Sequence, residues 1–437
     1  MTTLWQTWRR TARRQPDRVV VVEADTGCVC TAAELTLAAE RRAARLPTGV
    51  RAFTRPNSAE WLVEFLAIQR RGGIAVPLEP GHPLAAPHPD PLPIEWGEGI
   101  RLRFPSPRLR GESHGEGRLR DICLIKTTSG TTGQSQPIFC TANNLLADGR
   151  QVSATMGITA ADVNLALIPF GHSYGLGNLV LPLIQQGTPV VCAAAFVPRQ
   201  IPDWIERHRV TVFPTVPAVL RALVRLPGPI ALSSLRLVIS AGAPLAPELA
   251  RQFHEKFGIP VHNFYGASET GGICYDRTGA GRGVGQPLRG VRVTIRRDGR
   301  IVVASRAVTG TGRFVLADRG EWGPAGELIL TGRVGVVANI GGRKVAAVAV
   351  EAELRQVSGV VEAWVTVTRD GRGNDLLAAA VESDRPRVEI ERALAGRLPL
   401  WQLPKRWHIA RHLPRTERGK LDTAALRRAL DCGPSGD

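Results

Sequence analysis

The sequence predicts an α/β protein with a large N-terminal domain of doubly wound sheets, a small β subdomain and a small, mobile α+β C-terminal domain. First, a chain of 437 residues is too long for one ordinary core, so at least two folding units are expected. Second, short apolar runs alternate with helical patterns from 121 to about 275, as in doubly wound sheets. Third, residues 283–331 change to short strand-like runs, and an α+β pattern returns after Gly332. We therefore predict domains over 1–331 and 332–437.

The first 80 residues read as mixed α/β. We expect helices over 4–15, 32–45 and 59–71, and strands over 19–23 and 72–80. Residues 81–120 differ, because they are rich in Pro, Gly, Arg and Glu and have no periodicity. Such a segment inside a compact domain is usually a lid, a linker or disorder. We expect 81–120 to be an exposed, disordered insertion, and assign it no function.

The central region alternates strands with helices. The expected strands are 121–125, 164–170, 188–194, 210–215, 235–242 and 260–266. The expected helices are 143–155, 177–186, 202–208, 217–225 and 247–257. Short β-like runs follow at 291–297, 300–305, 313–318 and 327–332, and the C-terminal domain adds strands at 360–367 and 376–382 and a helix. In a doubly wound sheet the ligand site lies at the carboxyl ends of the strands.

Composition limits the class of protein. The net charge of +17 raises nucleic-acid binding, but that interpretation rests on charge alone, because the basic residues are spread along the chain without an aromatic RNA-binding motif or a zinc finger. The seven cysteines are scattered, and reduced structural thiols are expected. No stretch is long enough to span a bilayer, and the N-terminus lacks an apolar signal core. These features favour a cytoplasmic protein without a membrane span or a nucleic-acid partner.

The most informative run is KTTSGTTG at 126–133, which follows the apolar strand 121–125. Glycine lets the backbone approach a ligand, and hydroxyls with free N–H groups can surround phosphate oxygens. The run is not a Walker loop, because Gln134 follows Gly133 where that motif requires Lys. It therefore predicts a phosphate-binding loop of another kind.

Five further motifs accompany this loop. They are IPFGHSYGLGN at 168–178, ISAGAPLAPEL at 239–249, NFYGASETGG at 263–272, FVLADRGEW at 314–322 with TGRVGVVANIGGRKV at 331–345, and LPRTERGKLD at 413–422. In order and spacing, the set resembles the adenylate-forming (AMP-binding) superfamily, which includes acyl-CoA and aryl-CoA ligases, luciferases and peptide-synthetase adenylation domains. The resemblance runs from about Trp5 to Leu430. It implies an N-terminal AMP-binding domain and a C-terminal lid domain.

The resemblance implies a site for ATP and Mg²⁺. Gly242 and Ala243 would provide a flat surface for the purine, and Tyr265, followed by Gly266, would stack on it. Ser268 would bind the α-phosphate and Glu269 would ligate Mg²⁺, and the ribose hydroxyls would be bound by Asp318 and Arg333. The β- and γ-phosphates would be held by the loop residues Thr128, Ser129, Gly130, Thr131, Thr132 and Gly133.

The resemblance also implies an acyl pocket formed by His172, Tyr174 and Gly175, with the imidazole beside the acid's carboxylate. Amino-acid-activating relatives carry an Asp near this position, and residues 170–173 contain none, which argues for an acid without an α-amino group. Whether the acid is fatty or aromatic stays open. Lys420 would contact the carboxylate and the α-phosphate during adenylation, since a positioned cation stabilises charge that develops there.

The chain departs from the family pattern at several positions. The loop's usual Pro and Lys are replaced by Ser135 and Gln136, which removes one cation from the phosphate site. The hinge residue is Gly335 instead of Asp or Lys, and a later Lys is Asn339. Gly342 matches the glycine that lines the pantetheine tunnel of relatives.

The implied activity is ATP-dependent formation of an acyl-adenylate, followed by transfer to a thiol, with coenzyme A as the expected acceptor. Rotation about the Gly335 hinge would separate the two half-reactions. The sequence leaves open loading of an acyl carrier protein through its phosphopantetheine, an enzyme that stops at the adenylate, and a non-catalytic nucleotide- or acyl-binding homologue.

Overall fold

The computed structural model describes residues 2–78, 121–127, 137–193, 195–333, 337–340, 343–370, 374–416 and 421–431. The expected insertion at 81–120 lies outside these residues. The chain divides into two compact units. The first comprises Met1–Val293, Val303–Phe314 and Ala325–Glu327, and the second comprises Thr294–Val302, Val315–Pro324 and Leu328–Asp437. The domain boundary after residue 331 stays a prediction.

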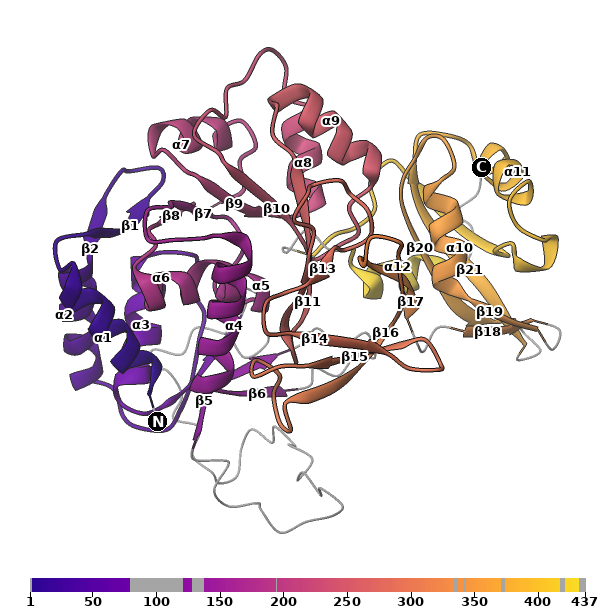
Figure 1. The fold of residues 1–437 in the computed structure, drawn as a ribbon. Coiled ribbons are helices and arrows are strands. Elements are labelled where there is room, and N and C mark those ends of the chain that lie inside the picture. Colours follow the sequence, from indigo (N-terminus) through magenta and orange to yellow (C-terminus); the bar gives the residue numbers. More distant parts are fainter. Residues whose placement is uncertain are drawn as a thin grey trace, which may run out of the picture. The chain divides into compact units, whose positions relative to one another are not determined.

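A nine-stranded sheet in the order β13-β12-β11-β10-β9-β7-β8-β1-β2 is the centre of the first unit (Figure 1). The six strands from β1 to β11 in this order run parallel, and β2, β12 and β13 pair antiparallel at the two edges. The strands are β1 (Val19–Glu23), β2 (Val29–Thr31), β7 (Asn164–Ala166), β8 (Val190–Cys192), β9 (Val212–Thr215), β10 (Leu237–Ser240), β11 (Val261–Ala267), β12 (Gly271–Tyr275) and β13 (Gln286–Pro287).

The strand order reverses beside β7. From β7 the chain continues to β8 on one side, and the next strand, β9, lies on the other side of β7. Such a switch point is where doubly wound sheets bind ligands.

A second sheet of the first unit has the order β3-β4-β5-β6. Strands β3 (Val50–Phe53), β4 (Ile74–Pro77) and β5 (Ile122–Thr127) are parallel, and β6 (Pro137–Thr141) returns antiparallel. The predicted phosphate loop therefore connects β5 to β6. Lys126 of β5 pairs with Ile138 of β6 close to the two ends of this loop.

Helices of the first unit begin at positions that the sequence marks. Thr3, Thr31 and Thr141 each form a capping box with the residue three positions later, which satisfies free N–H groups of the first turn. The helices are α1 (Leu4–Arg14), α2 (Ala32–Ala44), α3 (Ala59–Arg70), α4 (Ala142–Met156), α5 (Ser173–Gly175), α6 (Leu181–Gln186), α7 (Ile201–Arg207), α8 (Pro217–Val224) and α9 (Pro247–Phe257). Buried side chains of α7, α8 and α9 form one core with the strands from β1 to β11.

The remaining strands begin with a four-stranded sheet of β14 (Arg292–Ile295), β15 (Arg300–Ala304), β16 (Arg313–Trp322) and β17 (Leu328–Arg333). Most residues of this sheet belong to the second unit. The second unit further contains the pair β18 (Val337–Ile340) and β19 (Arg343–Ala346), and a sheet of β20 (Val360–Arg369), β21 (Asp375–Ser383) and β22 (Arg406–Ala410). Its helices are α10 (Ala347–Arg355), α11 (Arg387–Ala395), the short η4 (Leu400–Gln402) and α12 (Thr423–Asp431). Apolar residues of α10, α11, β20 and β21 form its core.

The predicted α/β class is confirmed, and so are most predicted elements within a few residues. The helix expected over 177–186 differs, because it begins with a π-helical turn at Leu176–Val180. The sequence analysis also missed the short antiparallel strands β2 and β12, whose three and five residues show little of the alternation that marks a longer strand. None of the described helices is both long and apolar enough to cross a membrane.

An ion pair between a buried carboxylate and an exposed guanidinium joins the amino ends of three central strands. Asp162 precedes β7, and its carboxylate accepts hydrogen bonds from the Arg236 guanidinium before β10 at 2.7 Å and from the Thr211 hydroxyl before β9 at 2.8 Å. Burial opposes ionisation, but the bonds from Arg236, from the Thr159 N–H and from Thr211 outweigh it and hold the pKa of Asp162 below its usual range.

We predict that Asp162→Ala lowers the free energy of unfolding by about 2 kcal/mol at pH 7, because it removes the charge-assisted hydrogen bonds that join three segments to one carboxylate. Since the folded pKa is depressed, the stabilisation is present above the unfolded pKa and disappears as the pH falls through the folded value. Urea unfolding at several pH values measures both effects. The control is Asp203→Ala, whose pair with Arg207 is exposed and should contribute less than about 0.5 kcal/mol. Equal losses in the two variants would contradict this account.

Candidate active site

Three of the predicted motifs lie at one edge of the nine-stranded sheet. His172 follows β7, Gly242 follows β10, and Ser268 follows the last residue of β11. Because these strands run parallel, their carboxyl ends meet at the same edge, beside the switch point between β7 and β9. The topology therefore brings together residues that are separated by nearly 100 positions in the sequence.

A direct hydrogen bond joins two of these motifs. The Ser173 hydroxyl lies 3.0 Å from the Ser268 hydroxyl. The neighbouring His172 caps the short helix α5, and its Nδ1 accepts the N–H of Tyr174 at 3.1 Å. When Nδ1 is an acceptor, the neutral ring carries its proton on Nε2. The imidazole is then in the tautomer that can donate to the oxygen of a carboxylate.

Tyr174 fixes this segment against the sheet. Its hydroxyl donates to the Ile239 carbonyl of β10 at 2.9 Å and accepts the Thr215 N–H of β9 at 3.1 Å. The ring is buried, and burial raises the pKa of Tyr174 above its ordinary value, so the hydroxyl stays protonated. A Cβ on Gly175 would overlap with the carbonyl of Pro169, so this turn requires glycine. The structure thus gives Tyr174 and Gly175 a positioning role, and their predicted place in an acyl pocket stays a prediction.

Asn57 supports the same segment from the chain that follows β3. Its side-chain amide donates to the carbonyls of Ala166 and Ile168 at 2.9 Å and accepts the Phe170 N–H at 2.8 Å. The side chain is buried, so these backbone groups depend on it in place of water. Asn57 was not predicted, because one Asn before a helical pattern reads as a turn residue.

The predicted purine surface is open. Gly242 has a φ of 82°, in the left-handed region that favours glycine, and it is exposed together with Ala243. Tyr265 is half-buried and Gly266 is exposed. A Cβ on Gly266 would lie 2.8 Å from the Gly271 carbonyl oxygen, so glycine is required there as well. Exposed backbone next to an aromatic ring is suited to binding a flat base.

Glu269 has the properties of a ligand for a hard cation. Its backbone carbonyl accepts the Thr309 N–H at 3.1 Å, which holds the residue in place, and its side chain is half-buried. Across the described part of the chain, no three His, Cys, Asp or Glu side chains cluster closely enough to hold a metal alone. Mg²⁺ needs no such cluster, because it is commonly bound by one or two carboxylates together with phosphates and water. Glu269 therefore fits a magnesium ion that arrives with a nucleotide.

The two residues predicted to bind ribose face each other in a hairpin. Asp318 of β16 and Arg333 of β17 are direct partners in the antiparallel register. Asp318 is half-buried. The sequence motifs lie 15 positions apart, and the hairpin brings their backbones together, as a shared ligand requires.

The comparison with protein families supports the same interpretation. The sequence model of the AMP-binding enzyme family matches residues 8–87 and 95–313, which is more than half of the chain. The protein belongs to the AMP-binding enzyme family. Its predicted membership of the adenylate-forming group is thereby confirmed.

Curated relatives of this AMP-binding enzyme are named as coenzyme A ligases. A probable 2-succinylbenzoate–CoA ligase of Mycobacterium tuberculosis is 32% identical over 335 residues, covering 70% of this chain and 84% of the relative. A feruloyl-CoA synthase of an Amycolatopsis species is 26% identical over 486 residues, covering 96% of this chain and 97% of the relative.

Solved structures share the fold. ATP-bound MatB of Rhodopseudomonas palustris has a TM-score of 0.81 at 22% identity, covering 98% of both chains. The O-succinylbenzoate coenzyme A synthetase of Bacillus subtilis in complex with AMP has a TM-score of 0.77 at 22% identity, covering 100% of this chain and 99% of the other. The predicted fold class is therefore confirmed along the length of the AMP-binding enzyme.

Two charged residues beside the site were not assigned a role from the sequence. Lys126 of β5 is 5% exposed, and its ammonium lies 3.4 Å from the Ser268 carbonyl oxygen. Asp148 of α4 is equally buried and accepts the Gly272 N–H at 2.9 Å. Burial raises the pKa of Asp148, although the charge of Lys126 and the Gly272 N–H favour its carboxylate. In the sequence, both residues could be noticed only as a charge in an otherwise apolar segment, a strand for Lys126 and a helix face for Asp148.

Several predicted site residues lie outside the described residues, and their roles stay predictions. They are Thr128, Ser129, Gly130, Thr131, Thr132, Gly133, Gly335, Gly342 and Lys420. The side chain of Arg333 also lies outside the description.

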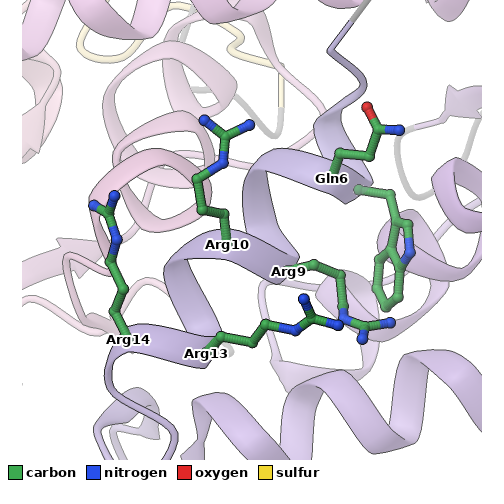
Figure 2. Close-up of a pocket in the computed structure, with 6 residues that line it drawn as sticks. Gln6, Arg9, Arg10, Arg13 and Arg14 are labelled. Carbon is green, nitrogen blue, oxygen red and sulfur yellow. The ribbon is translucent and has the colours of Figure 1, made fainter.

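An arginine-rich hollow on α1 is separate from these motifs. It measures about 530 Å³ and is lined by Trp5, Gln6, Arg9, Arg10, Arg13 and Arg14. Figure 2 shows that all of these side chains come from one helix, with Arg10 and Arg14 on one side and Arg9 and Arg13 on the other. Arg9 is already paired with Glu40 at 2.8 Å. Because none of the motif residues lines this hollow, we do not assign the active site to it.

We predict that Tyr174→Phe lowers the free energy of unfolding by about 1–3 kcal/mol, because two buried backbone groups lose their partner. Tyr275→Phe is the matched control, since Tyr275 is also buried but no described residue hydrogen-bonds its hydroxyl. Urea unfolding followed by tryptophan fluorescence measures both. If Tyr174→Phe is no more destabilising than the control, the hydroxyl does not hold the segment to β9 and β10.

Proposed function

We propose that this AMP-binding enzyme activates a carboxylic acid, fatty or aromatic, with ATP, and then transfers the acyl group to the thiol of coenzyme A. The observation that carries the proposal is the meeting of the His172 and Ser268 segments at the carboxyl edge of the sheet, joined by the Ser173–Ser268 hydrogen bond. One segment is predicted to hold the acid and the other the α-phosphate. The two reacting groups would therefore be bound side by side.

The first half-reaction is an in-line displacement at phosphorus. A carboxylate oxygen of the acid forms a bond to the α-phosphorus of ATP, the bond from that phosphorus to the bridging oxygen breaks, and pyrophosphate leaves. The Nε2–H of His172 would orient the carboxylate, and the Ser268 hydroxyl would hold an α-phosphate oxygen. Glu269 would hold Mg²⁺, which neutralises phosphate charge when bound. Lys420 would stabilise the charge that develops at the α-phosphate.

The second half-reaction is thioester formation. The thiolate sulfur attacks the acyl carbon, the bond from that carbon to the AMP oxygen breaks, and AMP leaves. We propose that the C-terminal lid domain, 332–437, rotates about Gly335, so that Lys420 is withdrawn and Gly342 lines the thiol tunnel. Rotation of one domain is a common means of separating two reactions at one site. We place this chemistry in the cytoplasm, where ATP and coenzyme A are available.

The acid class is supported by two observations. Residues 170–173 contain no carboxylate that would pair with a substrate ammonium. The relatives whose names specify an acid include ligases for 2-succinylbenzoate and ferulate, which are both aromatic. An acyl carrier protein is the alternative acceptor, and its phosphopantetheine would present the same thiol as coenzyme A.

We expect pyrophosphate release from ATP and Mg²⁺ with at least one acid in a panel of fatty, cinnamic and benzoic acids. Addition of coenzyme A should then yield AMP and the acyl-CoA thioester. Mass spectrometry of the products distinguishes coenzyme A from a carrier protein as the acceptor. ATP binding without pyrophosphate release for any acid would count against the enzymatic proposal and favour a non-catalytic nucleotide-binding homologue.

We further predict that Glu269→Gln lowers kcat/KM for pyrophosphate release by at least about 100-fold, because the neutral amide is a poorer ligand for Mg²⁺. The Mg²⁺ concentration at half-maximal rate should rise in the variant. Glu248→Gln is the control, since this exposed carboxylate on α9 pairs only with surface groups. An unchanged Mg²⁺ dependence in Glu269→Gln would show that another group holds the metal.

A further inference from the structure

A buried lysine is the feature that the assigned roles leave unexplained. Charged side chains are rarely buried without partners, because removing an ammonium from water is costly. Lys126 is 5% exposed, and among the residues that the structure describes its one hydrogen-bond acceptor is the Ser268 carbonyl at 3.4 Å. An ammonium has three donors, and one long bond does not satisfy them. Lys126 therefore has donor capacity for an anion that binds nearby.

The position of Lys126 connects it to the nucleotide motifs. It is the second-last residue of β5, and the sequence of the phosphate loop begins directly after that strand. Its acceptor, Ser268, contacts Ser173 through the side chain and precedes Glu269. The ammonium is thus adjacent to the two residues that are predicted to hold the α-phosphate and Mg²⁺.

The Lys126 ammonium shares its surroundings with two carboxylates, those of Asp148 and Glu269. Burial raises the pKa of the Cys140 thiol on β6, the charge of Lys126 lowers it, and the charges of Asp148 and Glu269 raise it. Asp148 is already engaged by the Gly272 N–H. No ion pair within 4 Å joins Lys126 to either carboxylate among the described residues, so neither occupies its remaining donors.

The other lysines are poor candidates for the same role. The chain contains five, at 126, 256, 344, 405 and 420. Lys256 donates to the carbonyls of Val224 and Leu226, and Lys344 and Lys405 belong to the second unit. Lys420 already has a predicted role at the carboxylate. Lys126 is therefore the lysine of the first unit that lies beside the predicted phosphate site.

We propose that Lys126 is a ligand of the ATP phosphates and replaces the phosphate-loop lysine, whose position is occupied by Gln136. This inference rests on the proposed function, because it assigns a residue to the same ATP site. A cation held in a water-poor site stabilises phosphate charge more strongly than an exposed one. The positive charge that the loop lacks at Gln136 would then be supplied by Lys126, on the strand before the loop.

The test compares Lys126→Met with the double variant Lys126→Met/Gln136→Lys. We expect the single variant to lower kcat/KM for ATP on the order of 100-fold, and the double variant to recover at least about 10-fold of that loss. Lys256→Met is the matched control for loss of a lysine in the same unit, and its kcat/KM for ATP should change less than about 3-fold. If Lys126 had only a structural role, a lysine at position 136 would not restore kcat/KM for ATP.

Calorimetric titration separates this proposal from the proposed function. Lys126→Met should weaken binding of ATP at least about 10-fold while leaving adenosine affinity unchanged, whether or not an acid substrate has been found. If it does not fold, Lys126→Met/Asp148→Asn removes both buried charges and is titrated in its place. Equal effects on ATP and adenosine, or no recovery with Gln136→Lys, would overturn the proposal. Absence of pyrophosphate release from the wild-type protein would contradict only the enzymatic function.

Discussion

The parallel pairing of β7 with β9 is the constraint on which the site depends. At this point the chain continues to β8 on one side of β7 and to β10 on the other side of β9, which is the kind of switch point where doubly wound sheets bind ligands. Tyr174 lies at this position and bonds to the backbones of β9 and β10 with one hydroxyl. That single group aligns the His172 segment with the strands that carry the purine turn and the Ser268 turn.

The amino and carboxyl edges of the nine-stranded sheet differ in how their polar groups are bonded. At the amino edge, Asp162 and Arg236 form a closed set of hydrogen bonds that contributes to stability. At the carboxyl edge, polar backbone is exposed, as at Gly242 and Ala243. The amino edge therefore contributes to stability, whereas the carboxyl edge leaves backbone groups accessible to a ligand.

Much of the fold and of the motif set was predictable because both depend on local patterns. Helical periodicity and apolar runs identified α4, β10 and β11, and motifs such as NFYGASETGG supplied the predicted site residues. The supporting residues were not predictable, because their roles depend on neighbours distant in sequence. Asn57 bonds residues more than 100 positions away, and Lys126 meets a carbonyl 142 positions away. The π-helical turn at Leu176–Val180 likewise depends on packing that a periodic pattern does not encode.

The central claim is that the carboxyl edge of the nine-stranded sheet binds an adenylate. A crystal structure with a non-hydrolysable acyl-adenylate analogue tests it most directly. The account predicts the purine against Gly242–Ala243 and Tyr265, with the phosphate mimic within hydrogen-bonding distance of Ser268. An adenosine group bound elsewhere, for example in the arginine-rich hollow on α1, would contradict it.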